Sequence, residues 1–538
     1  MSTKSFFSQT LFLKGLTNYY IKSDFNVTIN LADVEKLYPL NGKILKGEFS
    51  ADLKAEGIYN KEKHQFPALD ASVRLINGYV KTPDYPEPLE NIHFIANARN
   101  KDGKPEDTRV TIEQFSYLLE GEPFSVNGYI EDFIKMKYDV KIKGVIDLEK
   151  LTKIYPLQGT QVKGVIDSDI EARGSIADLE NGNYAKTSCS GTIEIEKLQY
   201  TSESLPSTIT VSDALFRLSP SKVTMERFKG TLGKSDVSLT GDLTNYMYFV
   251  TSNNDVIKGD LVLTSDTLDL TEWIDATKPA AIGTTNTGTT TPSSTSTVWE
   301  VPKNVDFVFD SDLNTVLYED VRINQMKGEI TIKDGIMSLY ETGFNTLDAS
   351  FGVTGHYDTR DMKHPKFDCK LNINELDINK AYREVRLVRK LAPASGDTYG
   401  RVTVDYQIAG EVNSDGTAKM ETLVGGGKVS IANAKINGMK MFDEISKSSK
   451  KQDVKDPHLK DFSITTTIHD NKLFVEPFEL KVNGLNADIE GFNDINGGTV
   501  NYIVKIELIP IDKIRIPFHV TGTYDNPKVT MGKGKGDN

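Results

Sequence analysis

The stretch Val237-Ser-Leu-Thr-Gly241 alternates apolar and polar residues and ends in glycine. The same pattern occurs at Phe124-Ser-Val-Asn-Gly128 and at Ala487-Asp-Ile-Glu-Gly491. Successive side chains of a strand point to opposite faces, so this alternation predicts strands with one face buried and one in water. Turn-forming pairs such as Asn77-Gly78 and Asp334-Gly335 lie between or beside such runs and predict hairpins. The sequence therefore predicts a mainly β chain of antiparallel strands.

An internal repeat organises these strands. The unit Tyr38-Pro-Leu40, with Gly47 and Gly57, returns 117 positions later as Tyr155-Pro-Leu157, with Gly164 and Gly174, and its second half returns as Gly400 to Gly410. A fixed period of this kind is typical of repeat architectures. We expect an N-terminal strand region at 1–30, two repeats at 31–279, a Thr/Ser-rich disordered loop at 280–298, third and fourth repeats with terminal strands at 299–530, and a tail at 531–538.

Helical signals are few. Apolar residues recur at helical spacing over 378–392, where Asp377 is placed to cap the first turn and Pro393 to end the helix. We also expect short turns that Asp33 and other aspartates open and cap. A shorter apolar pattern predicts a second helix at 439–448. The helix at 378–392 also carries basic residues on its polar side, which would be either solvated or in contact with anionic headgroups.

A long sheet with so few helices has to hide its apolar face in another way. We expect a long curled antiparallel sheet that forms a repeating, taco-like β-groove with one or two short helices. A set of β-sandwiches has the same alternation and stays open as an alternative. The candidate groove residues come from equivalent strands of the repeats: Leu53, Ala55, Phe124, Val126, Ile170, Ala172, Val237, Leu239, Phe351, Val353, Tyr406, Ile408, Ala487 and Ile489.

Charge and composition argue against several classes of function. The net charge of −13 disfavours nucleic-acid binding, and no apolar run reaches the length of a membrane-spanning helix. Two cysteines in 538 residues cannot form a disulfide framework, and we expect both to be free. Gly425-Gly-Gly-Lys428 lacks the spacing of a phosphate-binding loop, and the seven histidines show no metal-ligand spacing. We expect no catalytic residues, no cofactor and no metal.

Several ordered motifs resemble the AsmA-like family, in particular the C-terminal region of members from Bacteroidetes-type bacteria. With the repeats, this resemblance spans about residues 30 to 530. The motifs are Ala214-Leu-Phe-Arg-Leu-Ser-Pro-Ser-Lys-Val223, Gly233-Lys-Ser-Asp-Val-Ser-Leu-Thr-Gly241, Thr267-Leu-Asp-Leu-Thr-Glu-Trp273, Leu376-Asp-Ile-Asn-Lys-Ala-Tyr-Arg383, Asn471-Lys-Leu-Phe-Val-Glu-Pro-Phe478 and Gly522-Thr-Tyr-Asp-Asn-Pro527.

The family is similar to the bridge-like lipid-transfer superfamily, which includes TamB. The resemblance implies a non-enzymatic, monomeric periplasmic protein that carries acyl chains of phospholipid or another lipid between the inner and outer membranes, in contact with these membranes or their proteins. It also implies an N-terminal membrane anchor in the full-length parent, which this sequence lacks. An assembly factor for outer-membrane proteins is the alternative, followed by an adhesion or carbohydrate-binding array of β-sandwiches.

Overall fold

The structure is a computed structural model. It describes residues 8–532, apart from 15–18, 37, 61, 64, 84, 155–159, 182, 184–185, 203–206, 247–248, 250–255, 272–298, 319–320, 415, 451–453, 483 and 510–513. The chain divides into two compact units, Met1–Leu261 and Val262–Asn538, and the division falls inside strand β14. The Thr/Ser-rich tract expected at 280–298 lies outside the described residues, as do Tyr155-Pro-Leu157 of the second repeat and the end of the tail.

Unit 1 consists mainly of long strands, with short helical segments between some of them. Its strands are β1 (Ser8–Lys14), β2 (Tyr19–Asn30), β3 (Ile44–Tyr59), β4 (Ala68–Thr82), β5 (Tyr85–Asn100), β6 (Thr108–Leu119), β7 (Glu122–Glu131), β8 (Lys137–Asp147), β9 (Thr160–Ser175), β10 (Ser188–Ser202), β11 (Ile209–Leu218), β12 (Lys222–Leu232), β13 (Ser235–Thr244) and the start of β14 (Ile257–Asp269). Its helical segments are η1 (Leu31–Lys36), η2 (Pro105–Asp107), α1 (Leu148–Ile154) and α2 (Ile176–Glu180).

Unit 2 follows the same plan and carries more helix towards its C-terminal end. Its strands after β14 are β15 (Val305–Tyr318), β16 (Val321–Lys333), β17 (Ile336–Thr346), β18 (Ala349–Asp358), β19 (Lys366–Asp377), β20 (Thr398–Glu411), β21 (Val424–Ile436), β22 (His458–Leu459), β23 (Phe462–His469), β24 (Lys472–Val482), β25 (Leu485–Asp494), β26 (Val500–Ile509), β27 (Ile514–Thr523) and β28 (Asn526–Met531). Its helical segments are α5 (Ile378–Glu384), α6 (Arg386–Leu391), η4 (Pro393–Asp397), η5 (Met420–Thr422) and α7 (Lys440–Ser449).

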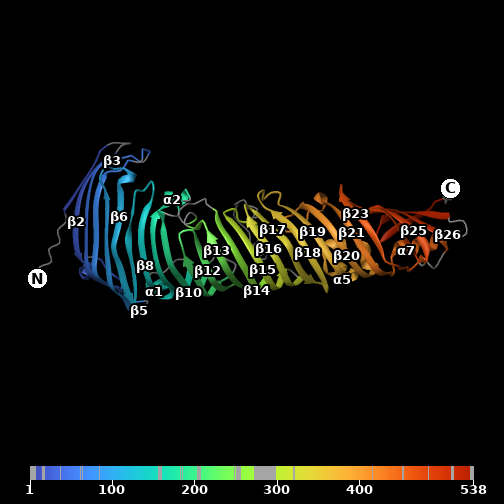
Figure 1. Cartoon of the computed structure of the whole chain (residues 1–538), viewed down its shortest axis with the longest axis horizontal. Helices are drawn as coiled ribbons and strands as arrows, with labels where there is room; N and C mark the ends of the chain where they lie inside the picture. Colours follow the sequence, from blue (N-terminus) through green and yellow to red (C-terminus); the bar gives the residue numbers. More distant parts are fainter. Residues whose placement is uncertain are drawn as a thin grey trace, which may run out of the picture. The chain divides into compact units, whose positions relative to one another are not determined.

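Within each unit the strands follow one another in chain order, as Figure 1 shows. Hydrogen-bonded antiparallel pairs join β1 through β13 in unit 1. The same pattern joins β15 through β21 and β23 through β28 in unit 2, where β21 pairs with both β22 and β23. The predicted fold class, mainly β with long antiparallel sheet and a few short helices, is confirmed.

The register of unit 1 gathers apolar residues on one face of the sheet. One row of directly paired positions crosses twelve strands and holds only apolar residues and glycine: Ile29, Phe49, Leu75, Phe94, Phe115, Val126, Ile142, Ile170, Gly191, Leu218, Val223 and Leu243. The adjacent row on the opposite face is polar: Ser116, Ser125, Lys143, Asp169, Thr192, Arg217, Thr224 and Asp242. Each sheet face therefore has one chemical character, as period-two alternation requires.

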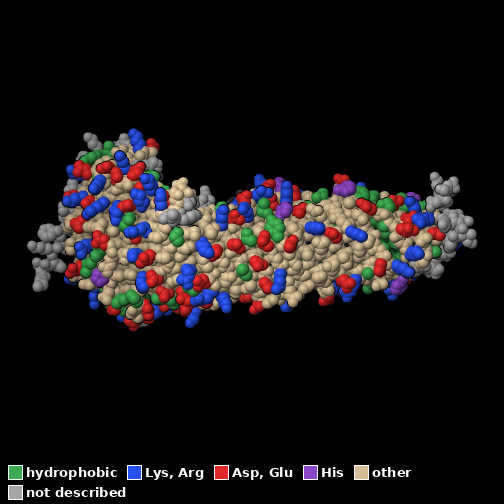
Figure 2. All heavy atoms as spheres, in the orientation of Figure 1, with side chains coloured by type: hydrophobic (Ala, Val, Ile, Leu, Met, Phe, Trp, Pro, Cys, Tyr) green, Lys and Arg blue, Asp and Glu red, His purple; other side chains and the backbone are tan. Residues whose placement is uncertain are grey.

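The polar face is held by ion pairs across neighbouring strands. Lys143 on β8 lies 2.6 Å from the carboxylate of Asp169 on β9, and Arg217 lies 2.6 Å from Glu226. Figure 2 shows the result on the face in view, where basic and acidic side chains are interspersed and few hydrophobic ones appear. Mixed charge of this kind keeps such a face in water.

The repeat seen in the sequence has a structural counterpart. Gly47, Gly164 and Gly400 each lie near the start of their strands with φ between 122° and 136°. At each glycine the strand register slips by a residue, which is the signature of a β-bulge. Glycine is required there because other residues rarely adopt this conformation.

Three local predictions need correction. The helix expected over 378–392 is broken at Val385, whose extended conformation (φ −109°, ψ 111°) separates α5 from α6. Asp33 lies inside η1 rather than capping it, and Asn30 instead accepts a hydrogen bond from the backbone of Ala32 at 3.0 Å. Asn77-Gly78 is not a turn, because both residues lie within β4 where its pairing with β5 shifts register.

Other local predictions are confirmed. Asp377 caps α5 by accepting a 2.7 Å hydrogen bond from the Lys380 backbone N–H. The helix expected at 439–448 is α7. Asp334-Gly335 forms the turn between β16 and β17, and both cysteines are free. The short turn predicted after Asp147 is α1, where the Asp147 carboxylate accepts a 3.1 Å hydrogen bond from the Lys150 backbone N–H, and α2 was not predicted.

The largest cluster of buried apolar residues in the described part of the chain lies at the C-terminal end of unit 2 and includes residues of α7. Phe442 and Ile445 from this helix pack with Val504, Phe518 and Val520 from β26 and β27, and all five side chains are buried. Leucine-sized side chains buried in this way each stabilise the fold by about 1.5–3 kcal/mol. This core anchors one end of the apolar face of unit 2.

Candidate functional site

The apolar face of unit 2 forms the wall of the candidate site. One row of paired positions runs from β17 to β23 and is entirely apolar: Phe344, Phe351, Ile373, Val404, Val429 and Ile464. The next row crosses to β28: Thr342, Val353, Leu371, Tyr406, Gly427, Thr466, Val475, Gly491, Tyr502, Val520 and Val529. These rows present a continuous apolar surface from strands far apart in the chain.

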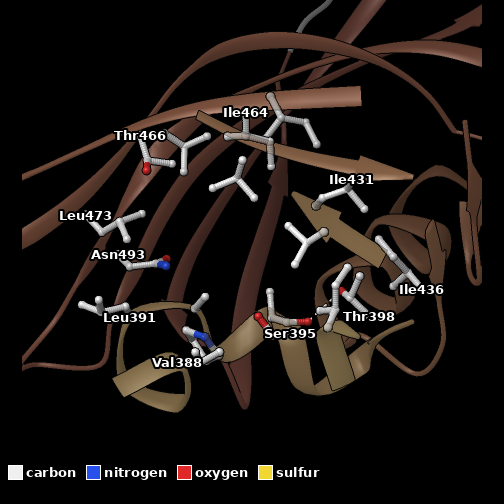
Figure 3. Close-up of a pocket in the computed structure, with 18 of the residues that line it drawn as sticks. Val388, Leu391, Ser395, Thr398, Ile431, Ile436, Ile464, Thr466, Leu473 and Asn493 are labelled. Atoms are coloured by element: carbon white, nitrogen blue, oxygen red, sulfur yellow. Dashed lines mark hydrogen bonds between the residues drawn. The ribbon is translucent and has the colours of Figure 1, made fainter. Parts of the chain in front are cut away.

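A cavity of about 450 Å³ lies against this wall. Such a volume falls within the range of small-molecule sites, about 300–1,000 Å³. Figure 3 shows Ile464, Thr466 and Ile431 from the strands on one side of the cavity, and Val388 and Ser395 from the helical segment on the other. Aliphatic and aromatic side chains dominate the lining, and no charged side chain is among the described residues that form it.

The segment α5–α6–η4 covers the cavity on the side opposite the strands. Leu387, Val388 and Leu391 of α6 contribute apolar side chains to the lining. The segment is tied down at its ends: Lys380 lies 2.6 Å from Asp348, and the side-chain amide of Asn379 donates to the Gly396 carbonyl at 2.8 Å. The break at Val385 lets α6 take its own direction over the opening.

A few polar groups sit among the apolar ones. The hydroxyl groups of Tyr406 and Thr466 share a hydrogen bond of 2.9 Å, and the Tyr502 hydroxyl donates to the side-chain oxygen of Asn493 at 2.9 Å. Burial raises the pKa of the Tyr406 and Tyr502 phenols above their usual value. Both therefore stay neutral across the physiological pH range, so the cavity is an uncharged compartment.

Gly427 explains how a tyrosine fits this wall. It lies directly opposite Tyr406 on β21, and a Cβ atom there would stand 2.7 Å from the Tyr406 ring. Gly427 therefore leaves room for the Tyr406 ring beside the cavity.

The candidate residues of unit 2 have different surroundings. Tyr406, Ile408 and Ile489 line the cavity. Phe351 stacks on Phe344 with ring centroids 5.2 Å apart, and Val353 lies beside it on the same face, partly exposed. Ala487 is on the same face as well, but it is 0% exposed within the core under α7.

The candidate residues of unit 1 all lie on its apolar face. Register places Leu53 and Ala55 of β3, Phe124 and Val126 of β7, Ile170 and Ala172 of β9, and Val237 and Leu239 of β13 on that face. Ala55 and Phe124 are buried, and Phe124 packs against Tyr117 with ring centroids 5.2 Å apart. The other six are partly exposed.

Partial exposure distinguishes this face from the interior of a sandwich. Leu53, Val126, Ile170 and Leu239 point to the apolar side yet remain in partial contact with solvent. Side chains between two packed sheets lose nearly all such contact. The apolar face of unit 1 is thus accessible at these positions.

Sequence reasoning missed the residues on the cover. Leu387, Val388 and Leu391 stand at helical spacing within the predicted helix, so their periodicity was a usable signal for an apolar side. Asn493 had no such signal, because a lone asparagine at a strand end is usually a turn residue. Only the fold brings it beside Tyr502 and the cavity.

No family model, no curated protein and no solved structure matches the chain. The resemblance to the AsmA-like family therefore stays a prediction. Among the described helices, none is long and apolar enough to cross a membrane. Within the same described part of the chain, no group of three or more His, Cys, Asp and Glu side chains is arranged to hold a metal ion.

Proposed function

We propose that this chain is a non-enzymatic lipid-binding and lipid-transfer protein of the bacterial envelope, which carries phospholipid acyl chains on its apolar sheet faces. The observation that carries this proposal is the uncharged, apolar cavity of about 450 Å³ in unit 2. An acyl chain gains free energy on entering such a space, at about 25 cal/mol for each Å² of apolar surface removed from water. An ion would lose its hydration there without a charged partner.

The accessible apolar face of unit 1 supports the same proposal. It offers partly exposed aliphatic positions in register over many strands, including Val126, Ile170 and Leu239. Acyl chains could slide along such a face while their headgroups remain in water. This passive mechanism needs no nucleophile and no cofactor.

The test is native mass spectrometry with lipid extraction on the purified chain. We expect co-purified phospholipid, and we expect Ile464→Glu to lower the lipid load by placing a carboxylate in the cavity. Thr465→Glu is the matched control, because Thr465 is the next residue of β23 and is exposed on the opposite face. Folded protein that is free of lipid, or an equal load in both variants, would contradict the proposal.

A role in outer-membrane protein assembly has one observation in its favour. Among the described residues β28 pairs with no strand other than β27, although α7 also packs against it. An unpaired edge can accept a strand from a client protein. Capture of unfolded β-barrel clients by lipid-free chain would favour this second function.

A further inference from the structure

The cover α5–α6 has two chemically different sides. Its inner side lines the cavity through Leu387, Val388 and Leu391. Its outer side exposes Arg383 and Arg386, together with Arg389 and Lys390. Residues 378–391 hold five basic side chains and one acidic side chain, Glu384, in a protein whose net charge is −13.

Most of the charged side chains on the outer side are not paired with other groups of the protein. Within the described part of the chain, Arg383, Arg386 and Lys390 form no ion pair or side-chain hydrogen bond that would neutralise them. Arg389 differs, because its guanidinium donates to the Arg383 carbonyl at 2.6 Å and so caps the end of α5. Lys380 is paired with Asp348.

Some cations on the sheet faces are instead paired across strands, as Lys143 is with Asp169. Two acidic groups near the cover are engaged, since Glu375 lies 3.8 Å from Arg401 and Asp397 accepts a hydrogen bond from Tyr524, whereas Glu384 is exposed. Three unpaired cations on the outside of a segment that roofs an apolar cavity match the chemistry of an anionic amphiphile surface. Phosphate groups of such a surface would meet the three cations.

We propose that the outer side of α5–α6 docks on an anionic phospholipid bilayer and so brings the cavity of unit 2 to the lipid source. This inference rests on the proposed lipid-binding function and names the membrane surface that would serve it. Basic residues on an amphipathic segment are attracted to anionic headgroups, and salt screens the attraction.

The experiment is flotation of the full chain with vesicles of phosphatidylglycerol and phosphatidylcholine, compared with vesicles of phosphatidylcholine alone. We expect binding to the anionic vesicles that added salt weakens. The triple variant Arg383→Glu/Arg386→Glu/Lys390→Glu should reduce the partition by more than tenfold. It should keep its co-purified lipid, because none of the three residues lines the cavity.

A matched control separates local docking from net charge. Lys370, Lys428 and Lys435 are exposed on β19 and β21, and their triple change to Glu alters the net charge by the same amount. This control should bind as the unaltered chain does. Equal losses in both variants, or equal binding to neutral vesicles, would overturn the docking proposal. If docking depends on Arg383, Arg386 and Lys390 but the chain never carries lipid, the docking proposal stands and the proposed function is wrong.

Discussion

The hydroxyl of Tyr524 donates a 2.6 Å hydrogen bond to the carboxylate of Asp397, 127 residues earlier in the chain. Tyr524 lies in the turn between β27 and β28, and Asp397 ends η4, so this bond ties the cover to the far end of the sheet. Burial first, and then the carboxylate itself, raise the pKa of the Tyr524 phenol. The bond therefore persists throughout the physiological pH range.

Tyr524→Phe should loosen the cover. A hydrogen bond to a charged group contributes roughly 1.5–3 kcal/mol, and its loss leaves Asp397 partly desolvated. We expect faster amide hydrogen exchange over residues 386–397 with little change in β19. Tyr382→Phe is the control, because the Tyr382 ring packs against Gly396 while its hydroxyl has no hydrogen bond among the described residues. Unchanged exchange in Tyr524→Phe would show that packing alone holds the cover.

Asp377→Ala should weaken the start of α5. The carboxylate accepts the Lys380 backbone N–H at 2.7 Å, and removal of such a cap costs about 1 kcal/mol. Exchange of the amides in the first turn of α5 measures the loss. Asp377→Asn should retain most of the protection, since an amide oxygen can cap as well. Equal protection in the alanine variant would rule out a capping role.

Gly355→Ala should destabilise unit 2, whereas Gly352→Ala should be tolerated. A Cβ at Gly355 would stand 2.3 Å from the Asp368 carbonyl oxygen on β19, so the strands would have to separate. At Gly352, three residues earlier on β18, the nearest atom is 3.8 Å away. Thermal unfolding of both variants measures the difference. A Gly355→Ala variant as stable as Gly352→Ala would contradict the close approach of β18 and β19.

Leu239→Glu should lower the lipid load of the chain while leaving it folded. Leu239 lies on the apolar face of unit 1, paired with Phe228, and is partly exposed. A carboxylate there would repel acyl chains but could still reach water. Thr240→Glu, on the exposed opposite face of the same strand, should have no effect. A full lipid load in folded Leu239→Glu protein would remove this position from the lipid path.

The stability of unit 1 should fall as the pH rises from about 10 to about 12. Burial, together with the hydrogen bond to Glu120, raises the pKa of Tyr85 from 10.0 to about 12. In that interval the phenol is ionised in the unfolded chain but protonated in the folded one, so unfolding releases a proton and becomes more favourable with pH. Denaturant unfolding at several pH values measures the slope. Tyr85→Phe should flatten it, and an unaltered slope would assign the effect to other groups.

Much of the fold was predictable because it depends on local chemistry. Alternation placed all fourteen candidate residues on the apolar faces, and turn residues such as Asp334-Gly335 fixed their hairpins. Asn77-Gly78 shows the limit, because the same dipeptide chemistry also suits a bulge inside a strand. Whether the chain turns or continues there is decided by pairing with β5, which no local pattern encodes.

The candidate site was predictable only in part. Tyr406, Ile408 and Ile489 line the cavity, but Ala487, two residues from Ile489, is sealed beneath α7. Alternation assigns both to the same face and cannot tell them apart. The structure buries both in the core with α7, where Ala487 is 0% and Ile489 is 7% exposed, and only Ile489 also lines the cavity.

The sequence by itself determined which side of each strand is apolar, because side-chain direction alternates with the backbone at every residue. It also determined the repeat, since Gly47, Gly164 and Gly400 adopt a positive φ that other residues rarely take. The tertiary structure alone decided where the apolar face stays open and where it closes. That outcome depends on contacts across long stretches of chain, such as Tyr524 with Asp397 and α7 with β26 and β27, and their free energy depends on the folded arrangement rather than on any local sequence pattern.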